Sequence, residues 1–173
     1  ESSNIDVLSS NAWLDLSNDG IVFHIPEIYK RFFLFEIFDG WTNVIKTIDT
    51  SSTDGKERNF TITGPGFKGT VPKNTTHIRS RTNIVYIKGM TQCFGTADYE
   101  NIYKIQNGYT LTPLANFGKP YSPPAIVQIS PVIATKESAH DQVNDMNYTQ
   151  FFNTFSNLLI QNPPLVQDVS ISK

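Results

Sequence analysis

The sequence contains a single cysteine and few charged residues, and both shortages limit what the protein can be. Cys93 is the only cysteine among 173 residues, which excludes an intrachain disulfide and any multi-cysteine metal site such as a zinc ribbon. We expect its thiol to be buried and inert rather than reactive. Asp, Glu, Lys and Arg together make up 17% of the chain, below the roughly 25% of typical domains.

Long apolar runs and an excess of basic charge are also missing. No apolar stretch approaches the roughly 18 residues that cross a bilayer, so we expect no membrane span. The formal charge is -2 and the isoelectric point is near 5.9. A nucleic-acid partner therefore has little electrostatic support, because no basic excess is left to neutralise phosphates. Localisation stays open, with a secreted, periplasmic or virion-associated protein favoured over a cytoplasmic one.

What the sequence does contain is a large apolar fraction arranged in short segments. Hydrophobic residues make up 39% and aromatic residues 12% of the chain, enough to form a sizeable core. From about 5 to 95, short segments of β type are separated by turn residues, which is typical of a sandwich or barrel. We therefore predict a single domain over 1–173 that is mostly β, with an antiparallel sandwich core over about 5–95.

Alternation and turn residues locate several strands. Residues 12–16 alternate and are followed by Asp19-Gly20, a hairpin turn candidate from which residues 21–25 return. Residues 30–39 carry apolar side chains on both faces, so we expect a central strand that is covered on two sides. The polar segment 49–58 is expected to be a surface loop.

Two helices follow the predicted strands. The spacing of apolar residues predicts a helix over about 97–107, with Thr96 as its N-cap. Residues 117–131 are rich in proline and are expected to form a connector without regular structure. A second helix is predicted over about 148–161, where Pro163-Pro164 ends the apolar pattern.

Several short motifs follow one another in the order found in one family. They are SSNAWLDL at 9–16, RFF at 31–33, DGWTNV at 39–44, TGPGFKG at 63–69 and FFN at 151–153. This ordered set resembles the family called domain of unknown function 1254, and the likeness spans about 4–164. The resemblance implies a sandwich of jelly-roll character with added helices. It implies no established activity.

The same resemblance bears on what accompanies the chain. Members of this family usually carry a second β module, domain of unknown function 1214, in the same polypeptide, and that module is missing here. The chain is therefore expected to be a fragment, a processed product or a form that lacks family segments at its ends. Sheet edges left without the second module also favour a homo-oligomer.

One candidate ligand-binding surface combines tryptophan rings with short polar side chains. Trp41 and Asn43 follow the long predicted strand, and Trp13 and Asp15 lie on a neighbouring one. An indole ring can cover the C–H face of a sugar while carboxylate and amide groups bond the sugar hydroxyls. The plainer interpretation is that the tryptophans are buried and that Asn43 and Asp39 satisfy turn backbone.

Two arginines form a second candidate for ligand binding. Arg79 and Arg81 alternate on one side of a short extended segment, where their guanidinium groups could clamp a carboxylate or phosphate. We favour the structural alternative, in which one arginine pairs with Glu36 or Asp39, since a carboxylate in an apolar strand needs a partner.

These residues lead to two functional hypotheses. The first is a non-enzymatic binding or structural module that takes a glycan or a protein partner, or that forms part of a surface or virion assembly. The second is a hydrolase with an acid pair among Asp15, Glu36 and Asp39, with Arg79 orienting the substrate. No cofactor and no metal are expected, because the three histidines are widely spaced and no metal-binding motif is present.

Overall fold

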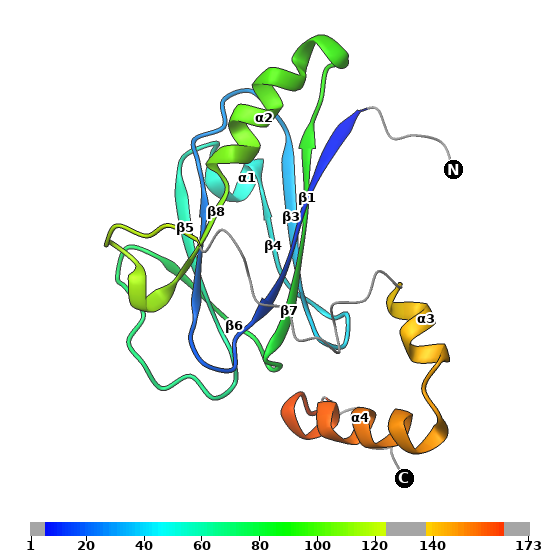
Figure 1. Ribbon diagram of the computed structural model, residues 1–173. Helices are drawn as coiled ribbons and strands as arrows, with labels where there is room; N and C mark the ends of the chain where they lie inside the picture. The colour runs from blue at the N-terminus through cyan, green and yellow to red at the C-terminus, as the bar shows by residue number, and fades with distance from the viewer. Residues whose placement is uncertain (1–5, 124–137, 165–173) are drawn as a thin grey trace. The chain divides into compact units, whose positions relative to one another are not determined.

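The computed structural model describes residues 6–123 and 138–164. The contacts between residues divide the chain into two compact units, 1–119 and 120–173. The first unit is a sandwich of two four-stranded sheets, and helix α2 (Tyr99–Gly108) lies at one end of the two layers (Figure 1). The expectation of a single domain over 1–173 stays a prediction.

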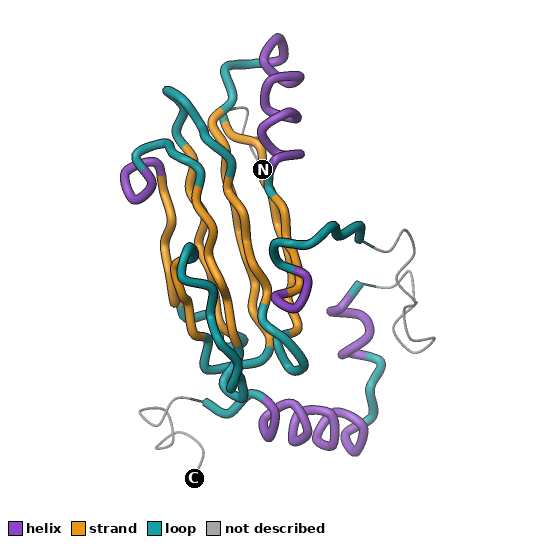
Figure 2. Tube along the Cα trace, turned by 90° about the vertical axis from the view of Figure 1, so that its left-hand side faces the viewer, coloured by secondary structure: helices purple, strands orange, loops and turns teal. Residues whose placement is uncertain are grey.

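The strands of the two sheets run alongside one another (Figure 2). Sheet A has the order β1 (Val7–Asp15), β7 (Ile84–Gln92), β3 (Phe33–Asp39), β4 (Val44–Asp49). Sheet B has the order β6 (Thr76–Arg79), β5 (Arg58–Thr63), β2 (Ile21–Ile25), β8 (Thr110–Pro113). All neighbours are antiparallel except β5 and β6, whose parallel pairing requires the long connection 64–75. The mostly β architecture is confirmed, and the jelly-roll connectivity stays a prediction.

Strand β3 is an inner strand of sheet A, and its pleat sorts its residues between two faces. Buried residues alternate with half-buried ones, with Phe33, Phe35, Ile37 and Asp39 on one face and Leu34, Glu36 and Phe38 on the other. The prediction that both faces would be covered is therefore wrong. One face packs on the core, while the other borders solvent and is shielded in part by side chains of the neighbouring strands.

The two turn signals had different outcomes. Asp39 and Gly40 lead from β3 into β4, and these strands pair as a hairpin. The hairpin expected at Asp19-Gly20 is wrong, because β1 pairs with β7 in sheet A whereas β2 pairs with β5 and β8 in sheet B. A turn signal reports a change of chain direction, not the strand with which the next segment pairs. Asp19 anchors this crossing by accepting a hydrogen bond from the backbone N–H of Ala115 at 3.0 Å.

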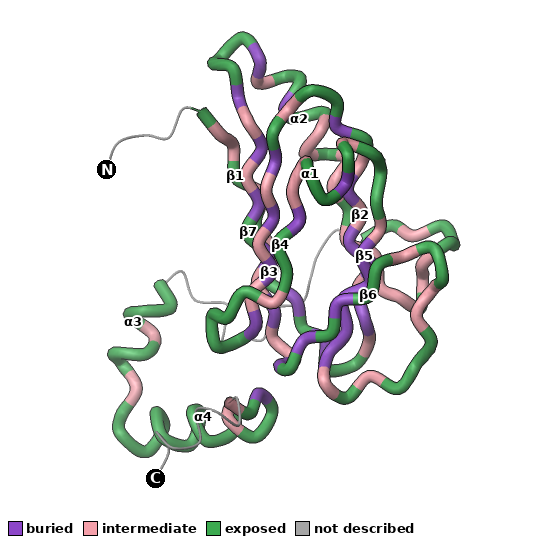
Figure 3. The backbone as a smooth tube through the Cα atoms, turned by 180° about the vertical axis from the view of Figure 1, so that it is seen from behind, coloured by how far each residue is buried: buried purple, intermediate pink, exposed green. Residues whose placement is uncertain are grey.

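The core lies between the sheets and extends to α2. Phe35 and Ile37 of sheet A meet Phe23 and Ile62 of sheet B in one buried cluster, and Ile102 of α2 is fully buried. Figure 3 shows the buried positions along the strands and mostly exposed positions in the loops. Burial of apolar surface between two layers is the main stabilising term of such a fold.

The first predicted helix is confirmed with a shift at its start. Residues Thr96–Asp98 form a 3₁₀ turn, and Asp98 rather than Thr96 precedes α2. Sequence patterns miss three short elements: β8, α1 (Thr50–Thr53) and α3 (Ala139–Asn144). Periodicity needs longer segments to be visible. The segment expected to be a loop thus begins with α1, which a capping box between Asp49 and Ser52 starts.

The second unit contains α3 and α4 (Tyr148–Gln161). The predicted helix over about 148–161 is confirmed, and a capping box between Asn147 and Gln150 begins it. Its large apolar side chains are exposed: Tyr148, Phe151, Phe152, Phe155, Leu158 and Ile160. The predicted connector over 117–131 lies outside the described residues from 124 onward. No helix within 6–123 and 138–164 is long and apolar enough to cross a membrane.

Candidate binding surface on sheet A

A row of large side chains crosses the outer face of sheet A. The strand register sets Trp13 of β1 opposite Tyr86 of β7, and Tyr86 opposite Phe38 of β3. Phe38 in turn lies opposite Val44 of β4. Residues directly opposite one another in neighbouring strands project to the same face of a sheet. We refer to Trp13, Tyr86 and Phe38 as the aromatic row.

The rings of the aromatic row support one another. The ring centroids of Trp13 and Tyr86 lie 4.6 Å apart with their planes tilted by 30°, and those of Tyr86 and Phe38 lie 6.1 Å apart with a tilt of 29°. Trp13 nevertheless remains 72% exposed. Its indole is therefore backed by Tyr86 and otherwise largely open to solvent, which makes it a fixed apolar surface on a regular sheet.

A polar row lies beside the aromatic row, two residues further along each strand. Asn11, Lys88 and Glu36 occupy opposing positions on β1, β7 and β3. No ion pair joins Lys88 to Glu36 in the described part of the chain. An amide, an ammonium and a carboxylate group are therefore available to a ligand on the aromatic row. Since the two charges have opposite signs, the polar row favours no particular ligand charge.

Four of the six predicted ligand-binding residues lie at one end of sheet A. Trp13 and Asp15 belong to the end of β1, and Trp41 and Asn43 belong to the turn between β3 and β4, with β7 running between the two strands. Trp41 is 36% exposed, half as much as Trp13. Trp13 is therefore the more exposed of the two indole rings at this end of sheet A.

Asp39 and Asn43 satisfy the backbone of the β3–β4 turn. The Asp39 carboxylate accepts hydrogen bonds from the backbone N–H groups of Trp41 and Asn43, both at 2.9 Å. The side-chain amide of Asn43 donates to the same carboxylate at 3.0 and 3.2 Å. Asp39 is only 3% exposed. Its oxygens therefore hold the turn and are not presented to a ligand.

The three carboxylates considered for hydrolysis do not converge. Asp39 faces the core and Glu36 faces outward, on opposite sides of β3. Asp15 lies opposite Ile84, four residues along β7 from the Lys88 that opposes Glu36, so the Asp15 and Glu36 backbones are roughly 16 Å apart. Glycoside hydrolysis needs carboxyl groups about 5 to 9.5 Å apart. Asp15 instead accepts bonds from the backbone N–H and the hydroxyl of Ser17, at 2.9 and 2.6 Å.

Arg79 is the last residue of β6 in sheet B, and Arg81 lies in the loop that leads from β6 to β7 of sheet A. Arg79 donates to the carbonyl oxygen of Pro65 at 3.0 Å. Neither arginine forms an ion pair with Glu36 or Asp39 in the described residues, so the favoured pairing is not found. Both side chains are exposed, and neither residue occupies one of the paired strand positions that form the aromatic row.

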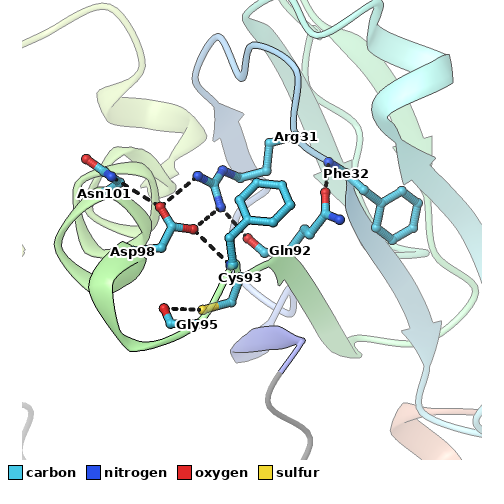
Figure 4. Close-up of polar contacts among 8 residues, drawn as sticks. Arg31, Phe32, Gln92, Cys93, Gly95, Asp98 and Asn101 are labelled. Atoms are coloured by element: carbon cyan, nitrogen blue, oxygen red, sulfur yellow. Dashed lines mark hydrogen bonds and ion pairs between the residues drawn. The ribbon is translucent and has the colours of Figure 1, made fainter.

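A polar cluster that the sequence patterns miss joins the segment before β3 to the start of α2 (Figure 4). The two terminal nitrogens of Arg31 donate to the Asp98 carboxylate at 2.6 and 3.0 Å. The backbone N–H of Phe94 and the amide of Asn101 donate to the same carboxylate, each at 3.1 Å. These bonds, that from Arg31 above all, hold the pKa of Asp98 well below its usual range. Four donors therefore satisfy the Asp98 carboxylate within the protein.

No metal centre is found among the described residues. Within 6–123 and 138–164, no group of three or more His, Cys, Asp or Glu side chains is placed to hold a metal ion. His24 lies 3.0 Å from the Asn59 side chain, and His77 lies 2.8 Å from the hydroxyl of Thr63. Cys93 is buried, as expected.

Comparison with known proteins agrees with the sandwich architecture. No curated protein matches the chain. The crystal structure of the VPA0106 protein from Vibrio parahaemolyticus is similar, with a TM-score of 0.62 and 17% sequence identity over 91% of this chain. At that identity the likeness shows a shared fold alone. The chain spans only 40% of the length of that protein.

The family model covers most of the sandwich unit. The family described as "Protein of unknown function (DUF1254)" matches residues 2–113, which include all eight strands of both sheets. The motifs noted in the sequence up to TGPGFKG fall inside this match, in their expected order. The chain therefore belongs to the DUF1254 family.

Proposed function

We propose that this chain is a carbohydrate-binding module and that an uncharged glycan binds along the aromatic row. The observation that carries the proposal is the 72% exposure of Trp13, whose indole nevertheless lies against Tyr86. A single exposed apolar side chain is common, but Trp13 continues into a row of rings with Tyr86 and Phe38, and contiguous exposed apolar surface marks binding sites. Aromatic residues of this kind provide large contact area with little loss of side-chain freedom.

The geometry of the row suits a sugar ring. A pyranose presents an apolar C–H face and a rim of hydroxyl groups, so it needs a ring to stack on and polar side chains at the ring's border. Trp13 supplies the first, and Asn11 on the same strand and face lies in the polar row next to it. Lys88 and Glu36 continue the polar row across β7 and β3, so a second sugar unit would meet donors and acceptors as well.

The hydrolase hypothesis has less support. Its three candidate carboxylates lie on different faces or far apart, and Asp39 and Asp15 are engaged by turn backbone. A binding module needs no such convergence. Binding by the outer face of sheet A is therefore the function that the arrangement of side chains supports best.

The test measures binding of soluble neutral oligosaccharides, including β-1,4-linked glucose and N-acetylglucosamine chains, to the full chain and its Trp13→Ala variant. We expect a saturable interaction with the wild type. Trp13→Ala should weaken binding by at least about 1 kcal/mol, or roughly fivefold in Kd, because a tryptophan that becomes buried on binding often contributes much of the binding energy.

The matched control is Tyr29→Ala. Tyr29 is 77% exposed, close to the exposure of Trp13, but it lies in the segment between β2 and β3 and not in the aromatic row. We expect its removal to leave binding unchanged. A wild type that binds none of the oligosaccharides, or a folded Trp13→Ala variant that binds as the wild type does, would overturn the proposal.

A further inference from the structure

β1 and β8 each form an edge of their sheet in the described part of the chain. Among the strands within 6–123 and 138–164, β1 pairs with β7 alone and β8 pairs with β2 alone. A cavity of about 200 Å³ lies between these strands and the C-terminal end of α2. Side chains from both sheets and from α2 reach it, so it is a property of the fold rather than of one loop.

Aromatic rings make up much of the cavity wall. Phe23, Phe35 and Tyr109 all line it. The ring centroid of Phe35 lies 4.9 Å from that of Phe23 and 4.9 Å from that of Tyr109, with interplanar angles of 74° and 86°. Such edge-to-face contacts are the preferred arrangement of aromatic side chains. One more ring entering the cavity would continue the same packing.

The cavity is partly open to solvent, and its volume suits an occupant of about one ring. Cavities for drug-sized ligands measure roughly 300–1,000 Å³, whereas an apolar cavity of about 150 Å³ accommodates benzene. The cavity of this protein, at about 200 Å³, is slightly larger than the one that accommodates benzene. It leaves space for a single ring and a small substituent.

The polar groups at the cavity are neutral. Gln106 donates through its side-chain amide to the carbonyl oxygen of Ser9 at 3.0 Å and to the hydroxyl of Ser10 at 3.1 Å. These bonds fix the amide and leave its Oε1 as an acceptor. The hydroxyl of Tyr109 is engaged with Thr91 at 2.9 Å. No charged side chain is among the residues that line the cavity in the described part of the chain, so an ionic ligand would lose its hydration without gaining a partner.

We propose that this cavity binds an uncharged, single-ring aromatic compound that carries a hydroxyl group. The ring packs against Phe23 and Phe35, and the hydroxyl donates to Oε1 of Gln106. The two proposed sites depend on different rings, because Trp13 does not line the cavity and projects from the face of β1 opposite to Ala12, which does. Asn11 of the polar row also borders the cavity, so Trp13 and not Asn11 distinguishes the two sites. Either proposal can therefore fail without the other.

The test titrates phenol into the isotopically labelled full chain and follows it by NMR. We expect saturable shifts with a Kd of about 1 mM, as is usual for so small a ligand. Intermolecular contacts should appear between the phenol ring and the side chains of Phe23, Phe35 and Leu111. Benzoate, a charged compound of similar size, should bind at least about tenfold more weakly.

Two variants separate the ring contact from the hydroxyl contact. Ala12→Leu fills the cavity and should weaken phenol binding at least about tenfold, while Ser9→Leu, the same side chain on the opposite face of β1, should leave it unchanged. Gln106→Leu should weaken binding of phenol but not of toluene, which has no hydroxyl. Since Gln106 is only partly buried, this variant keeps the test decisive if Ala12→Leu does not fold.

Trp13→Ala serves as the control against the glycan surface and should bind phenol as the wild type does. The proposal would be overturned by phenol shifts that do not saturate within about tenfold of the expected Kd. Contacts that map outside the cavity, equal binding of benzoate, or unchanged binding by folded Ala12→Leu would have the same consequence.

Discussion

Arg31 and Asp98 lie 67 positions apart in the sequence and form a two-point ion pair, with N–O distances of 2.6 and 3.0 Å. The same guanidinium group donates to the carbonyl oxygen of Gln92 at 2.6 Å and lies over the ring of Phe94, 4.9 Å from its centroid. The pair thus fastens the segment before β3 to the end of β7 and to the start of α2. Planar two-point pairs of this kind have little freedom to rearrange.

The first prediction concerns the dependence of stability on pH. The pKa of Asp98 is lowered in the folded state from its ordinary value of 3.8, so the carboxylate stabilises the fold at pH values above 3.8, and this contribution is lost as the pH falls through the lowered pKa. Asp98→Asn removes the charge. We therefore expect the wild type to exceed Asp98→Asn in stability at about pH 7, and the difference to shrink below about pH 4.

Urea unfolding of both proteins at several pH values measures this difference. Glu100→Gln provides the control, since Glu100 is exposed two positions further along and has no bond to Arg31 among the contacts of this cluster. Its difference from the wild type should stay small throughout. An Asp98→Asn difference that grows toward acid pH would contradict the assigned role of the ion pair.

The second prediction concerns Gly89, which lies opposite Phe35 in the register of β7 and β3. A Cβ atom at Gly89 would lie 2.2 Å from Cε1 of Phe35 and 2.9 Å from the carbonyl oxygen of Ser10. Gly89→Ala should therefore lower the free energy of unfolding by about 2–3 kcal/mol, since the ring has to leave its position. Urea unfolding provides the measurement.

Gly66→Ala is the matched control for Gly89→Ala. A Cβ at Gly66 would meet nothing within 4 Å, so this variant should change the unfolding free energy by less than about 0.5 kcal/mol. Combining Gly89→Ala with Phe35→Leu should give less than the sum of the two losses, because the smaller side chain relieves the overlap. Strict additivity would show that the loss at Gly89 has another cause.

The fold was more predictable from the sequence than the pairing of its strands. The segment 30–39 carried enough apolar residues to identify a strand, and helices of 10 and 14 residues were visible through their periodicity. The Asp19-Gly20 turn signal indicates a chain reversal but predicts the wrong pairing partner for β2. Pairing between distant strands depends on long-range burial, which a local sequence pattern does not contain. Elements of four residues, such as α1 and β8, were too short to show a period.

The candidate site was predicted only in part, for a related reason. The residue type alone marks Trp13 as a candidate, but its supporting rings, Tyr86 and Phe38, come from strands that only the register brings beside it. For Asp39 the sequence leaves two roles open, an acid of a hydrolase pair and an acceptor for turn backbone, and its bonds to the β3–β4 turn confirm the second. A single sequence gives residue types and local spacing. It does not give which residues oppose one another across a sheet.

The third prediction concerns Asp39. Its carboxylate accepts bonds from the backbone N–H groups of Trp41 and Asn43 while almost fully buried. Asp39→Ala should lower the free energy of unfolding by about 2 kcal/mol, since backbone donors lose a charged acceptor. Asn43→Ala removes only the side-chain donor and should cost less than about 1 kcal/mol. The two values from urea unfolding in the opposite order would contradict the assignment of Asp39 as the centre of the turn.

The fourth prediction concerns Tyr109, whose hydroxyl lies 2.9 Å from the hydroxyl of the fully buried Thr91. Tyr109→Phe should cost about 1 kcal/mol, because it leaves the Thr91 hydroxyl without this partner. Tyr103→Phe, at a side chain that is 53% exposed, should cost almost nothing. In a double-mutant cycle, Thr91→Val should remove most of the effect of Tyr109→Phe, since either change alone breaks the same bond.

The Tyr109 hydroxyl also makes the stability of the fold sensitive to alkaline pH. Burial raises the pKa of Tyr109 above its ordinary value of 10.0, so the neutral phenol is favoured in the folded state. The stabilisation that the neutral Tyr109 side chain provides is fully present below about pH 10 and is lost as the pH rises through the raised pKa. The stability difference between the wild type and Tyr109→Phe should therefore shrink above about pH 10. A difference that stays constant would mean that Tyr109 ionises equally in both states, and that the cavity beside it is wetter than its aromatic wall indicates.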